Sequence, residues 1–380
     1  MNKILLSGGG TAGHVNPALA IAEIIKKHNP GAEFLYVGTP DGMEKGIVTR
    51  EGYEYAAVAV DGFSRKLTPK GIMRNIRSLT YLAKSGTVCK NIIKNFSPDI
   101  VIGTGGYVCG PVCMTAAKMG IPTLIHEQNA FPGVTTKLLS ERVDEVMLAF
   151  PDAAKRLGEN VKYSVTGLPT RDSFTERQMT RAEAKAKLGL DDSLTILSFG
   201  GSLGARCINN VALDVISFEE KLRKQSGIKI NHIHGYGKNG REDFLTAFKD
   251  LMPDVNNKRL KISEYINDMT TNLIAADLVI ARAGASTITE LEALGRASIL
   301  IPSPNVTENH QYYNAMVLGS RGAAVVYEEK ELTPGKITAK IEELIKSPDK
   351  LNQMAKNAAA IFEKTTAEKI YSVIVNSTQK

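Results

Sequence analysis

With 380 residues, the chain exceeds what one hydrophobic core usually organises, so we expect two domains. At 43% hydrophobic residues, each domain can bury a sizeable core. The four cysteines, Cys89, Cys109, Cys113 and Cys207, lack the paired CxxC spacing that zinc or redox chemistry needs. Residues 1–7 carry one lysine and a short apolar run, which fits neither a signal peptide nor a membrane span, so we expect a cytoplasmic protein.

The formal net charge of +7 is concentrated in one segment. No acidic residue occurs between Asp61 and Asp99, and the cations of that stretch are Arg65, Lys66, Lys70, Arg74, Arg77, Lys84, Lys90 and Lys94. A generally basic nucleic-acid binder would spread its cations over several elements, whereas the remainder of this chain is close to neutral. The charge pattern therefore predicts a local anionic partner surface and no nucleic acid.

The same segment has the periodicity of an amphipathic helix. Apolar and basic residues alternate at helical spacing over Lys70, Ile72, Arg74, Ile76, Arg77, Leu79, Ala83 and Lys84. An ordinary core-facing helix with a solvated basic face has the same periodicity. The uninterrupted absence of acids favours a helix lying on an anionic bilayer, because soluble faces normally mix both signs.

In chain order, short apolar runs alternate with longer stretches of helical spacing, which is typical of parallel α/β sheets. The predicted strands are residues 4–7, 34–37, 100–102, 123–126 and 146–148, then 195–199, 229–233, 278–281, 298–301 and 324–326. Both halves open with a strand, a glycine-rich turn and a helix. The joint between them is expected near residues 165–172, where an unpatterned polar stretch interrupts both periodicities.

Three glycine-rich loops, at residues 7–14, 103–111 and 199–206, each follow a predicted strand and precede a helix. Glycines let a backbone approach a ligand, and the N–H groups at a helix start attract phosphate. The first loop, whose helix we expect to begin at Pro17, also fits the GxGxxG pattern of NAD-dependent oxidoreductases. The second strand, however, ends in Gly38-Thr39-Pro40 without the acidic residue that would hold the NAD ribose, which disfavours that alternative.

Polar residues gather after other predicted strands. Residues 282–290 follow a predicted strand, and their small side chains suit a helix N-terminus, with Glu290 one turn into the helix. A carboxylate there can accept hydrogen bonds from ribose hydroxyls; a capping box with Thr287 is the alternative. Further clusters occupy residues 126–129 and 308–315, and such clusters at strand ends usually contact ligands. No DxD sequence occurs, so we expect helix termini and an arginine, rather than a catalytic metal, to stabilise a leaving group.

Read together, these residues resemble the MurG family, which transfers N-acetylglucosamine (GlcNAc) from UDP-GlcNAc to undecaprenyl-pyrophosphoryl-MurNAc-pentapeptide in peptidoglycan synthesis. The motifs that carry the resemblance, from end to end of the chain, are GGGTAGHVNP, GTGGYVCGP, HEQNAFPG, VTGLPTR, FGGSLGAR, RAGASTITE and HQYYNA. Ala12, Leu203 and His310 depart from the commonest family wording. Transferases of the same fold that glycosylate diacylglycerol share some of these motifs and are the nearest alternative.

The resemblance implies a GT-B fold, with two Rossmann-like domains of parallel sheet facing across a cleft. Residues 1–165 are expected to bind the lipid-linked acceptor and the membrane, residues 166–362 to bind the UDP-sugar, and a final helix at about 363–380 to pack on the first domain. The protein would then be peripheral on the cytoplasmic face of the membrane. No cofactor is implied, and cell-wall synthesis proteins are possible partners.

The resemblance also implies contacts for individual residues. Glu290 should hold the ribose, Ile266 the uracil through its backbone, and Ser202 with Arg171 the diphosphate. The residues implied to contact GlcNAc or to complete the cleft are Asn129, Gln311, Ala285, Ser286, Thr287, Thr11, Ala12 and Gly13. Tyr107 should contribute to acceptor binding.

Inversion at the anomeric carbon, which the resemblance implies, needs a base that deprotonates the acceptor hydroxyl. His14 and Glu127 are both candidates. A histidine after a glycine loop can instead hydrogen-bond a phosphate, and Glu127 can instead orient the acceptor. A non-catalytic nucleotide-sugar binding module is a further alternative, which UDP release in the presence of lipid acceptor would exclude.

Overall fold

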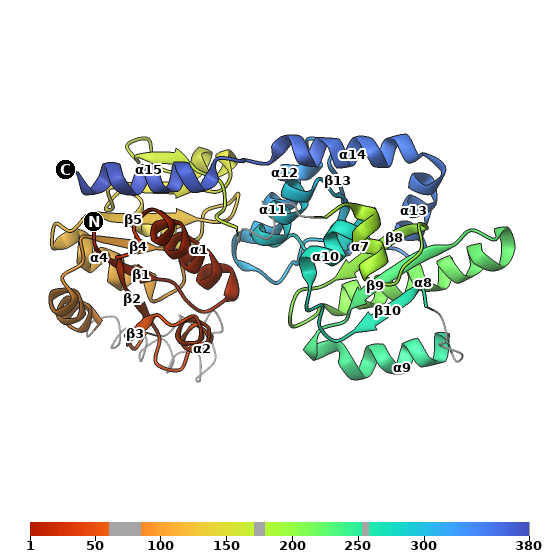
Figure 1. The fold of residues 1–380 in the computed structure, drawn as a ribbon, viewed down its shortest axis with the longest axis horizontal. Helices are drawn as coiled ribbons and strands as arrows, with labels where there is room; N and C mark the ends of the chain where they lie inside the picture. Colours follow the sequence, from red (N-terminus) through yellow and green to blue (C-terminus); the bar gives the residue numbers. More distant parts are fainter. Residues whose placement is uncertain (61–84, 171–178, 253–257, 380) are drawn as a thin grey trace. The chain divides into compact units, whose positions relative to one another are not determined.

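The computed structural model describes residues 1–60, 85–170, 179–252 and 258–379, which form two compact units (Figure 1). The first unit comprises Met1–Thr170 and Glu363–Lys380, and the second comprises Arg171–Phe362. The expected membrane residues Lys70, Ile72, Arg74, Ile76, Arg77 and Leu79 lie outside the described residues, and so does Arg171. Each unit has one parallel β-sheet with helices around it, as predicted.

The sheet of the first unit has seven strands in the order β3-β2-β1-β4-β5-β6-β7. Its strands are β1 (Lys3–Ser7), β2 (Glu33–Gly38), β3 (Glu54–Ala57), β4 (Ile100–Gly103), β5 (Thr123–Glu127), β6 (Glu145–Leu148) and β7 (Tyr163–Val165). Its helices are α1 (Ala12–His28), α2 (Met43–Arg50), α4 (Cys109–Lys118), α5 (Val134–Leu139), η1 (Pro151–Arg156) and α15 (Thr366–Thr378). Every strand pair is parallel, so all the strands end at the same edge.

Alternate residues of the central strands of this sheet build two separate apolar clusters, because successive side chains point to opposite faces. Ile4 and Leu6 of β1 belong to a cluster that also contains residues of α1 and α15. Leu5 belongs to the other cluster, with residues of α4 and α5. The chain's last helix therefore packs against the same face of the first unit as α1, and His28 of α1 stacks on Tyr371 of α15 with ring centroids 3.9 Å apart.

Helix α1 begins at Ala12, so the prediction that it starts at Pro17 was wrong. Pro17 lies inside the helix instead. An N–H group at position 17 would have bonded to the carbonyl of Gly13, which is in the first turn and exposed. The proline therefore removes only one hydrogen bond near the helix end, which a 17-residue helix tolerates.

The second unit has a six-stranded sheet in the order β10-β9-β8-β11-β12-β13. Its strands are β8 (Leu194–Phe199), β9 (Ile230–Gly235), β10 (Leu260–Ser263), β11 (Leu278–Ala281), β12 (Ala297–Leu300) and β13 (Ala324–Val326). Its helices are α7 (Arg181–Lys187), α8 (Arg206–Ser226), η2 (Lys238–Gly240), α9 (Arg241–Leu251), α10 (Met269–Ala275), α11 (Ala285–Leu294), η3 (Thr307–Asn309), α12 (His310–Gly319), η4 (Glu329–Glu331), α13 (Lys336–Lys346) and α14 (Pro348–Ile361).

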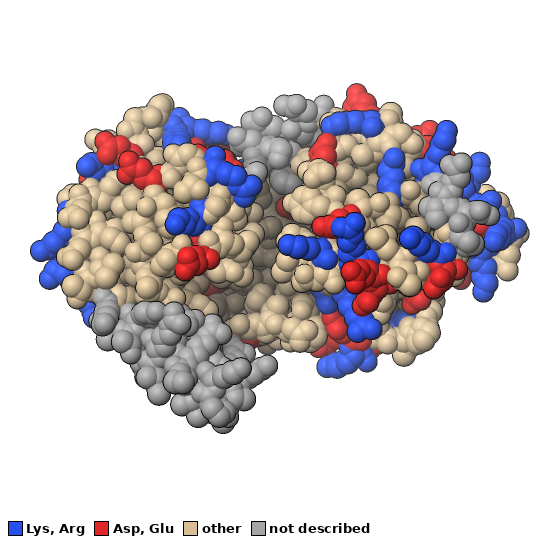
Figure 2. Space-filling view, turned by 90° about the horizontal axis from the view of Figure 1, so that it is seen from below, with Lys and Arg blue, Asp and Glu red and all other residues tan. Residues whose placement is uncertain are grey.

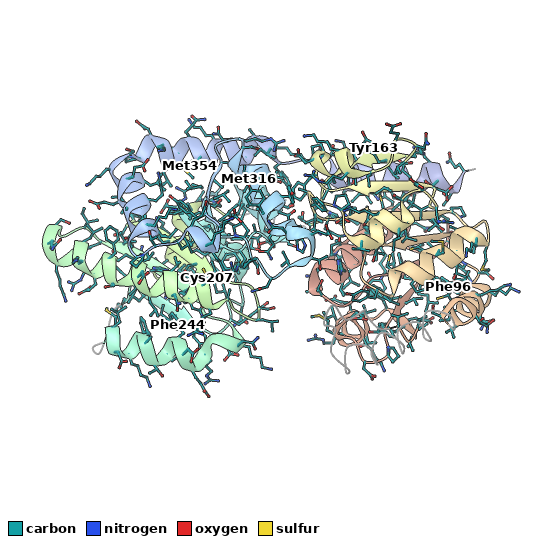
Figure 3. All side chains as sticks on the ribbon, turned by 180° about the vertical axis from the view of Figure 1, so that it is seen from behind. Phe96, Tyr163, Cys207, Phe244, Met316 and Met354 are labelled. Carbon is teal, nitrogen blue, oxygen red and sulfur yellow. The ribbon has the colours of Figure 1, made fainter. Side chains whose placement is uncertain are left out.

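Helices α8, α13 and α14 contribute to one apolar cluster of this unit, together with alternate residues of the central strands. Phe244 and Phe248 of α9 belong to a second, smaller cluster with Tyr236. Figure 3 shows Met354 of the first cluster and Phe244 of the second far apart within the unit. Helix α8 supplies residues to both clusters, which fixes the helix firmly beside the sheet.

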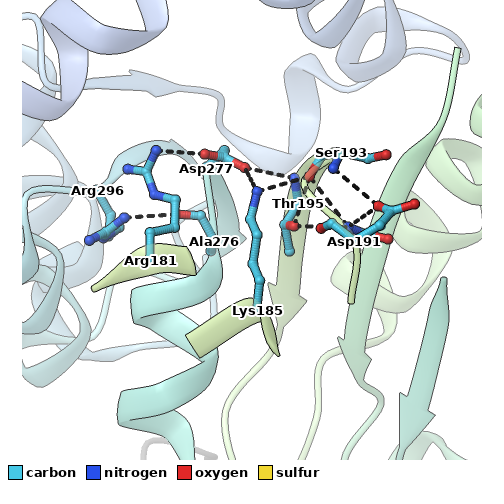
Figure 4. A network of polar contacts seen from close by, with 9 residues as sticks. Arg181, Lys185, Asp191, Ser193, Thr195, Ala276, Asp277 and Arg296 are labelled. Carbon is cyan, nitrogen blue, oxygen red and sulfur yellow. Dashed lines mark hydrogen bonds and ion pairs between the residues drawn. The ribbon is translucent and has the colours of Figure 1, made fainter. Parts of the chain in front are cut away.

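A partly buried ionic network fixes α7 to the second unit (Figure 4). Asp277, directly before β11, accepts hydrogen bonds from Arg181 at 2.7 Å and from Lys185 at 2.9 Å. It also accepts one from the backbone N–H of Thr195 at 2.9 Å, at the start of β8. One carboxylate therefore connects α7 to two neighbouring strands of the sheet.

None of the helices in the described part of the chain combines the length and the apolar character that crossing a bilayer requires.

Candidate functional site

A pocket of about 440 Å³ lies at the carboxyl ends of the strands in the second unit. The loop after β8, the first residues of α8, the β11–α11 turn and the loop after β12 supply most of its wall. The lining residues are Phe199, Gly200, Gly201, Gly204, Ala205, Arg206, Cys207, Arg282, Gly284, Thr287, Ser303, Asn305, Gln311 and Glu329. In an open parallel sheet this edge is where ligands bind, and the strand order reverses at β8 and β11.

The third glycine-rich loop brings backbone to the pocket wall. Gly204 has φ +79°, and a Cβ there would lie 2.2 Å from the carbonyl oxygen of Tyr236, so only glycine fits. Gly201 has φ +90° and open space where a side chain would be. Helix α8 then begins at Arg206 with no acidic residue in its first turn and no side-chain cap from Ala205. Its first N–H groups can therefore bind an anion in the pocket.

Arg282 joins the ends of three strands at the base of this pocket. Its guanidinium donates to the carbonyl oxygens of Ile301 at 3.0 Å and Pro302 at 3.1 Å. It also forms an ion pair with Glu329 of η4, which follows β13. These contacts hold the loop after β12 in place and neutralise the arginine's charge.

The next residue of that loop orients Gln311. The backbone N–H of Ser303 donates to Oε1 of Gln311 at 2.9 Å. Because a backbone N–H can only donate, Oε1 must be the atom facing it, and the Nε2 amide group is then the group that Gln311 offers to a ligand. The pocket thus offers hydrogen-bond donors from Gln311, Arg206 and the start of α8.

The other predicted donor-site residues of the second unit lie on the same sheet edge with different exposures. Ser202 is exposed on the glycine-rich loop, and Ala285, Ser286 and Thr287 form the first turn of α11. Thr287 of that turn lines the pocket. Glu290, further along α11, and Ile266 are not among the lining residues. Ile266 is buried, and a Cβ at Gly235, where β9 ends, would lie 3.1 Å from its side chain.

Glu290 is a partly buried carboxyl on α11. Burial raises its pKa to about 8, so the side chain is largely protonated at neutral pH in the free protein. No side chain or backbone group of the described residues hydrogen-bonds to it. The capping box with Thr287, which the spacing allowed, does not form, because α11 has no side-chain cap.

In the first unit, the first and second glycine-rich loops pack against each other. The N–H of Gly9 donates to the carbonyl oxygen of Gly105 at 3.2 Å, and the Thr104 hydroxyl donates to the carbonyl oxygen of His14 at 2.7 Å. A Cβ at Gly106, which has φ +85°, would lie 2.3 Å from the carbonyl oxygen of Gly9. The two loops therefore form one continuous backbone surface at the strand ends.

His14 lies on this surface, in the first turn of α1 after Thr11, Ala12 and Gly13. Its Nδ1 is 2.9 Å from the carbonyl oxygen of Gly9, which can only accept, so Nδ1 carries the proton in the neutral ring. Nε2 is then left with a lone pair, as a general base requires. Tyr107, in the second loop, is 63% exposed and available to a ligand.

Glu127 is bonded differently from the other candidate base. Its carboxylate is only 3% exposed and accepts hydrogen bonds from the Asn129 N–H and amide, the Gly133 N–H and the Thr136 hydroxyl, at 2.5 to 3.1 Å. Both oxygens are thus used in fixing the loop that carries Asn129. This geometry indicates an orienting group more than a base.

Glu44 is a site-forming residue that the sequence analysis missed. The carboxylate is fully buried and accepts hydrogen bonds from the Thr39 N–H and hydroxyl and from the Gly10 N–H. Burial alone would raise its pKa, but the hydrogen bonds from Thr39 and Gly10 outweigh it and lower the pKa. Glu44 therefore holds the first glycine-rich loop in its ionised form. In the second unit, Arg206, Ser303 and Glu329 line the pocket and were not singled out from the sequence either.

In the described residues, no three His, Cys, Asp or Glu side chains come together as they would around a metal ion.

Two parallel α/β units, with glycine-rich loops at their strand ends, have the architecture of the family 28 glycosyltransferases. The profile of the glycosyltransferase family 28 N-terminal domain matches residues 4–148, and that of the glycosyltransferase family 28 C-terminal domain matches residues 195–370. The crystal structure of MurG from Acinetobacter baumannii aligns with a TM-score of 0.77 at 28% identity, over 99% of this chain and 100% of that one.

Full-length relatives specify the family. A protein of Acetivibrio thermocellus named UDP-N-acetylglucosamine--N-acetylmuramyl-(pentapeptide) pyrophosphoryl-undecaprenol N-acetylglucosamine transferase is 44% identical over 98% of this chain and 97% of its own length. A protein of Desulforamulus reducens with the same name is 41% identical over 94% of this chain and 93% of its own. The chain belongs to the MurG family of glycosyltransferases, as its motifs predicted.

Proposed function

We propose that the chain transfers GlcNAc from UDP-GlcNAc to the MurNAc hydroxyl of undecaprenyl-pyrophosphoryl-MurNAc-pentapeptide, with inversion at the anomeric carbon. The observation that carries this proposal is the pocket of the second unit, with its glycine loop and uncapped α8 terminus, in a chain whose full-length relatives are named for this transfer. An anion-binding helix end beside hydrogen-bond donors suits a sugar diphosphate.

The donor is assigned mainly to the second unit. Glu290 accepts hydrogen bonds from the ribose, the backbone of Ile266 contacts the uracil, and Ser202 with Arg171 binds the diphosphate. The GlcNAc is bound by the first turn of α11 and by the Nε2 group of Gln311. Asn129 and the Thr11–Gly13 turn contribute from the first unit, where Tyr107 contacts the acceptor.

The reaction is a single in-line displacement. The acceptor oxygen forms a bond to the anomeric carbon as the bond from that carbon to the β-phosphate oxygen breaks, and the electron pair leaves with UDP. Nε2 of His14 takes the proton of the acceptor hydroxyl. Glu127 holds Asn129, which contacts the GlcNAc, and the loop that carries it in place.

The protein is assigned to the cytoplasmic face of the membrane as a peripheral protein. The acid-free segment 62–98 supports this location, because its cations would be attracted to an anionic leaflet. Its lipid-linked acceptor would lie in the same leaflet.

A transfer assay tests the proposal. Purified protein is mixed with radiolabelled UDP-GlcNAc and either the lipid-linked MurNAc-pentapeptide or diacylglycerol, and UDP release and labelled lipid are measured. We expect labelled product with the first acceptor alone, and none when UDP-glucose replaces UDP-GlcNAc. Transfer to diacylglycerol would favour the other class of transferase, and UDP-GlcNAc binding without turnover would favour a binding module.

A further inference from the structure

Arg206 is the first residue of α8, and it lines the pocket of the second unit. Its side chain is exposed. Within the residues that the structure describes, no carboxylate or carbonyl accepts a hydrogen bond from its guanidinium. The guanidinium of Arg206 is not paired with any described residue, so its positive charge and its N–H donors are available to a ligand in the pocket.

The second arginine of the pocket is in the opposite state. Arg282 is paired with Glu329, and its remaining donors are used by the Ile301 and Pro302 carbonyls. Among the residues that the structure describes, the charged side chains lining the pocket are Arg206, Arg282 and Glu329. Of these, Arg206 is the one whose positive charge has no paired carboxylate.

The backbone around Arg206 favours an anion at the same place. Gly201 leaves open space at the pocket wall, and α8 begins without a side-chain cap and without an acid in its first turn. The aligned peptides of a 21-residue helix add partial positive charge at that end. A guanidinium can in addition bind two phosphate oxygens at once, which gives it both charge and geometric fit.

We propose that Arg206 binds the diphosphate of the donor and stabilises the negative charge that UDP acquires as it leaves. This inference rests on the proposed function, because it assigns a further residue to the same donor pocket. When the bond between the anomeric carbon and the β-phosphate oxygen breaks, the electron pair stays on that oxygen. Arg206 offsets this charge, so it contributes to the rate as well as to donor affinity.

The test compares UDP with uridine by isothermal titration calorimetry. Arg206→Gln should raise the Kd for UDP about 10- to 100-fold and leave the Kd for uridine, which has no phosphate, within about twofold. The kcat should fall as well. Arg206→Lys, which keeps the charge but not the paired donors, should lie between the wild type and Arg206→Gln.

Arg223→Gln is the matched control, because Arg223 lies in the last turn of the same helix, in an exposed pair with Glu220. It removes the same charge far from the pocket and should leave UDP affinity unchanged. If the wild type binds UDP and Arg206→Gln binds it equally well, or if both variants lose affinity alike, the assignment of Arg206 is wrong. If the wild type binds neither UDP nor UDP-GlcNAc, the proposed function itself fails.

Discussion

Glu290 should make donor binding dependent on pH. Burial raises the pKa of its carboxyl to about 8 in the free protein, whereas the ionised form is the better acceptor for two ribose hydroxyls. Binding must then remove a proton at neutral pH. We expect UDP affinity to rise with pH from about 6 and to level off above about 8, where Glu290 is already ionised. Calorimetry in buffers of different ionisation enthalpy should detect release of up to one proton at about pH 7.

Two variants separate Glu290 from its neighbour on α11. Glu290→Gln should weaken UDP binding by about tenfold or more and remove most of the pH dependence. Glu292 is also buried with its pKa raised to about 8, but it faces Arg321. Glu292→Gln should therefore keep the wild-type pH profile. A pH profile that survives in Glu290→Gln would contradict the ribose assignment.

His14 and Glu127 should respond differently to substitution, because one offers a lone pair and the other is saturated with hydrogen bonds. We expect His14→Ala to lower kcat about a hundredfold or more with little change in the KM for UDP-GlcNAc. Added imidazole should restore part of the rate. Glu127→Gln should instead disturb the Asn129 loop, lowering kcat/KM without rescue by added carboxylates. If added carboxylates restored the activity of Glu127→Ala, and His14→Ala remained active, the two assignments would be reversed.

The motifs predicted which residues gather at the strand ends, but not which of them hold the others. Gly10 and Glu44 are 34 residues apart, and Arg282 and Glu329 are 47 apart, so no local pattern joins these partners. For Glu127, too, the sequence did not show which groups bond to the side chain, although these groups lie close to it in the chain. Its position after a strand predicted a functional carboxylate, whereas the donors that occupy it depend on the three-dimensional path of residues 129–136.

At the scale of elements, the carboxylate of Asp277 should contribute strongly to the stability of the second unit. Lys185 is 7% exposed in its pair with Asp277, so Asp277→Ala would leave a buried cation without its counter-ion, with only the Ser193 carbonyl as an acceptor. We expect a loss of about 3 to 5 kcal/mol in the free energy of unfolding. Hydrogen exchange of the second unit should show faster exchange in α7 and at the start of β8.

A double variant and a surface pair provide the controls for Asp277. Adding Lys185→Met to Asp277→Ala should recover part of the stability, because the unpaired charge is removed. Glu342→Ala breaks an exposed pair with Lys346, which should cost less than about 1 kcal/mol. If Asp277→Ala and Glu342→Ala lowered the free energy of unfolding by similar amounts, burial of the Asp277 network would contribute nothing to stability.

The elements that could be predicted were those with continuous apolar runs. Strands such as β1 and β8 lie inside their sheets and are buried along most of their length. The strands that were not predicted, β3, β7 and β10, each lie at a sheet edge and are only partly buried, so they lack such runs. Pro17 does not mark the start of α1, because the helix already begins at Ala12, directly after the glycine-rich loop.

At the scale of the whole molecule, the distribution of charge distinguishes segment 62–98 from the rest of the chain. Figure 2 shows acidic and basic side chains intermixed on the visible face of the second unit, as expected of a surface exposed to solvent. Segment 62–98 has eight cations and no acid. Each cation close to an anionic leaflet contributes about 1 kcal/mol, so half of them would give measurable adsorption that weakens as salt rises.

Reversing Lys70, Arg74 and Arg77 to glutamate should abolish sedimentation with anionic vesicles and leave transfer to a short-chain, water-soluble acceptor nearly intact. The matched control reverses Lys221, Lys224 and Lys229, which are exposed in the second unit, and changes the net charge by the same amount. If adsorption depends on overall charge, both triple variants will lose it equally. If it depends on segment 62–98, the control will still bind, and its binding will fall with ionic strength as in the wild type. A Lys70/Arg74/Arg77 variant that sediments normally with these vesicles would contradict the membrane assignment.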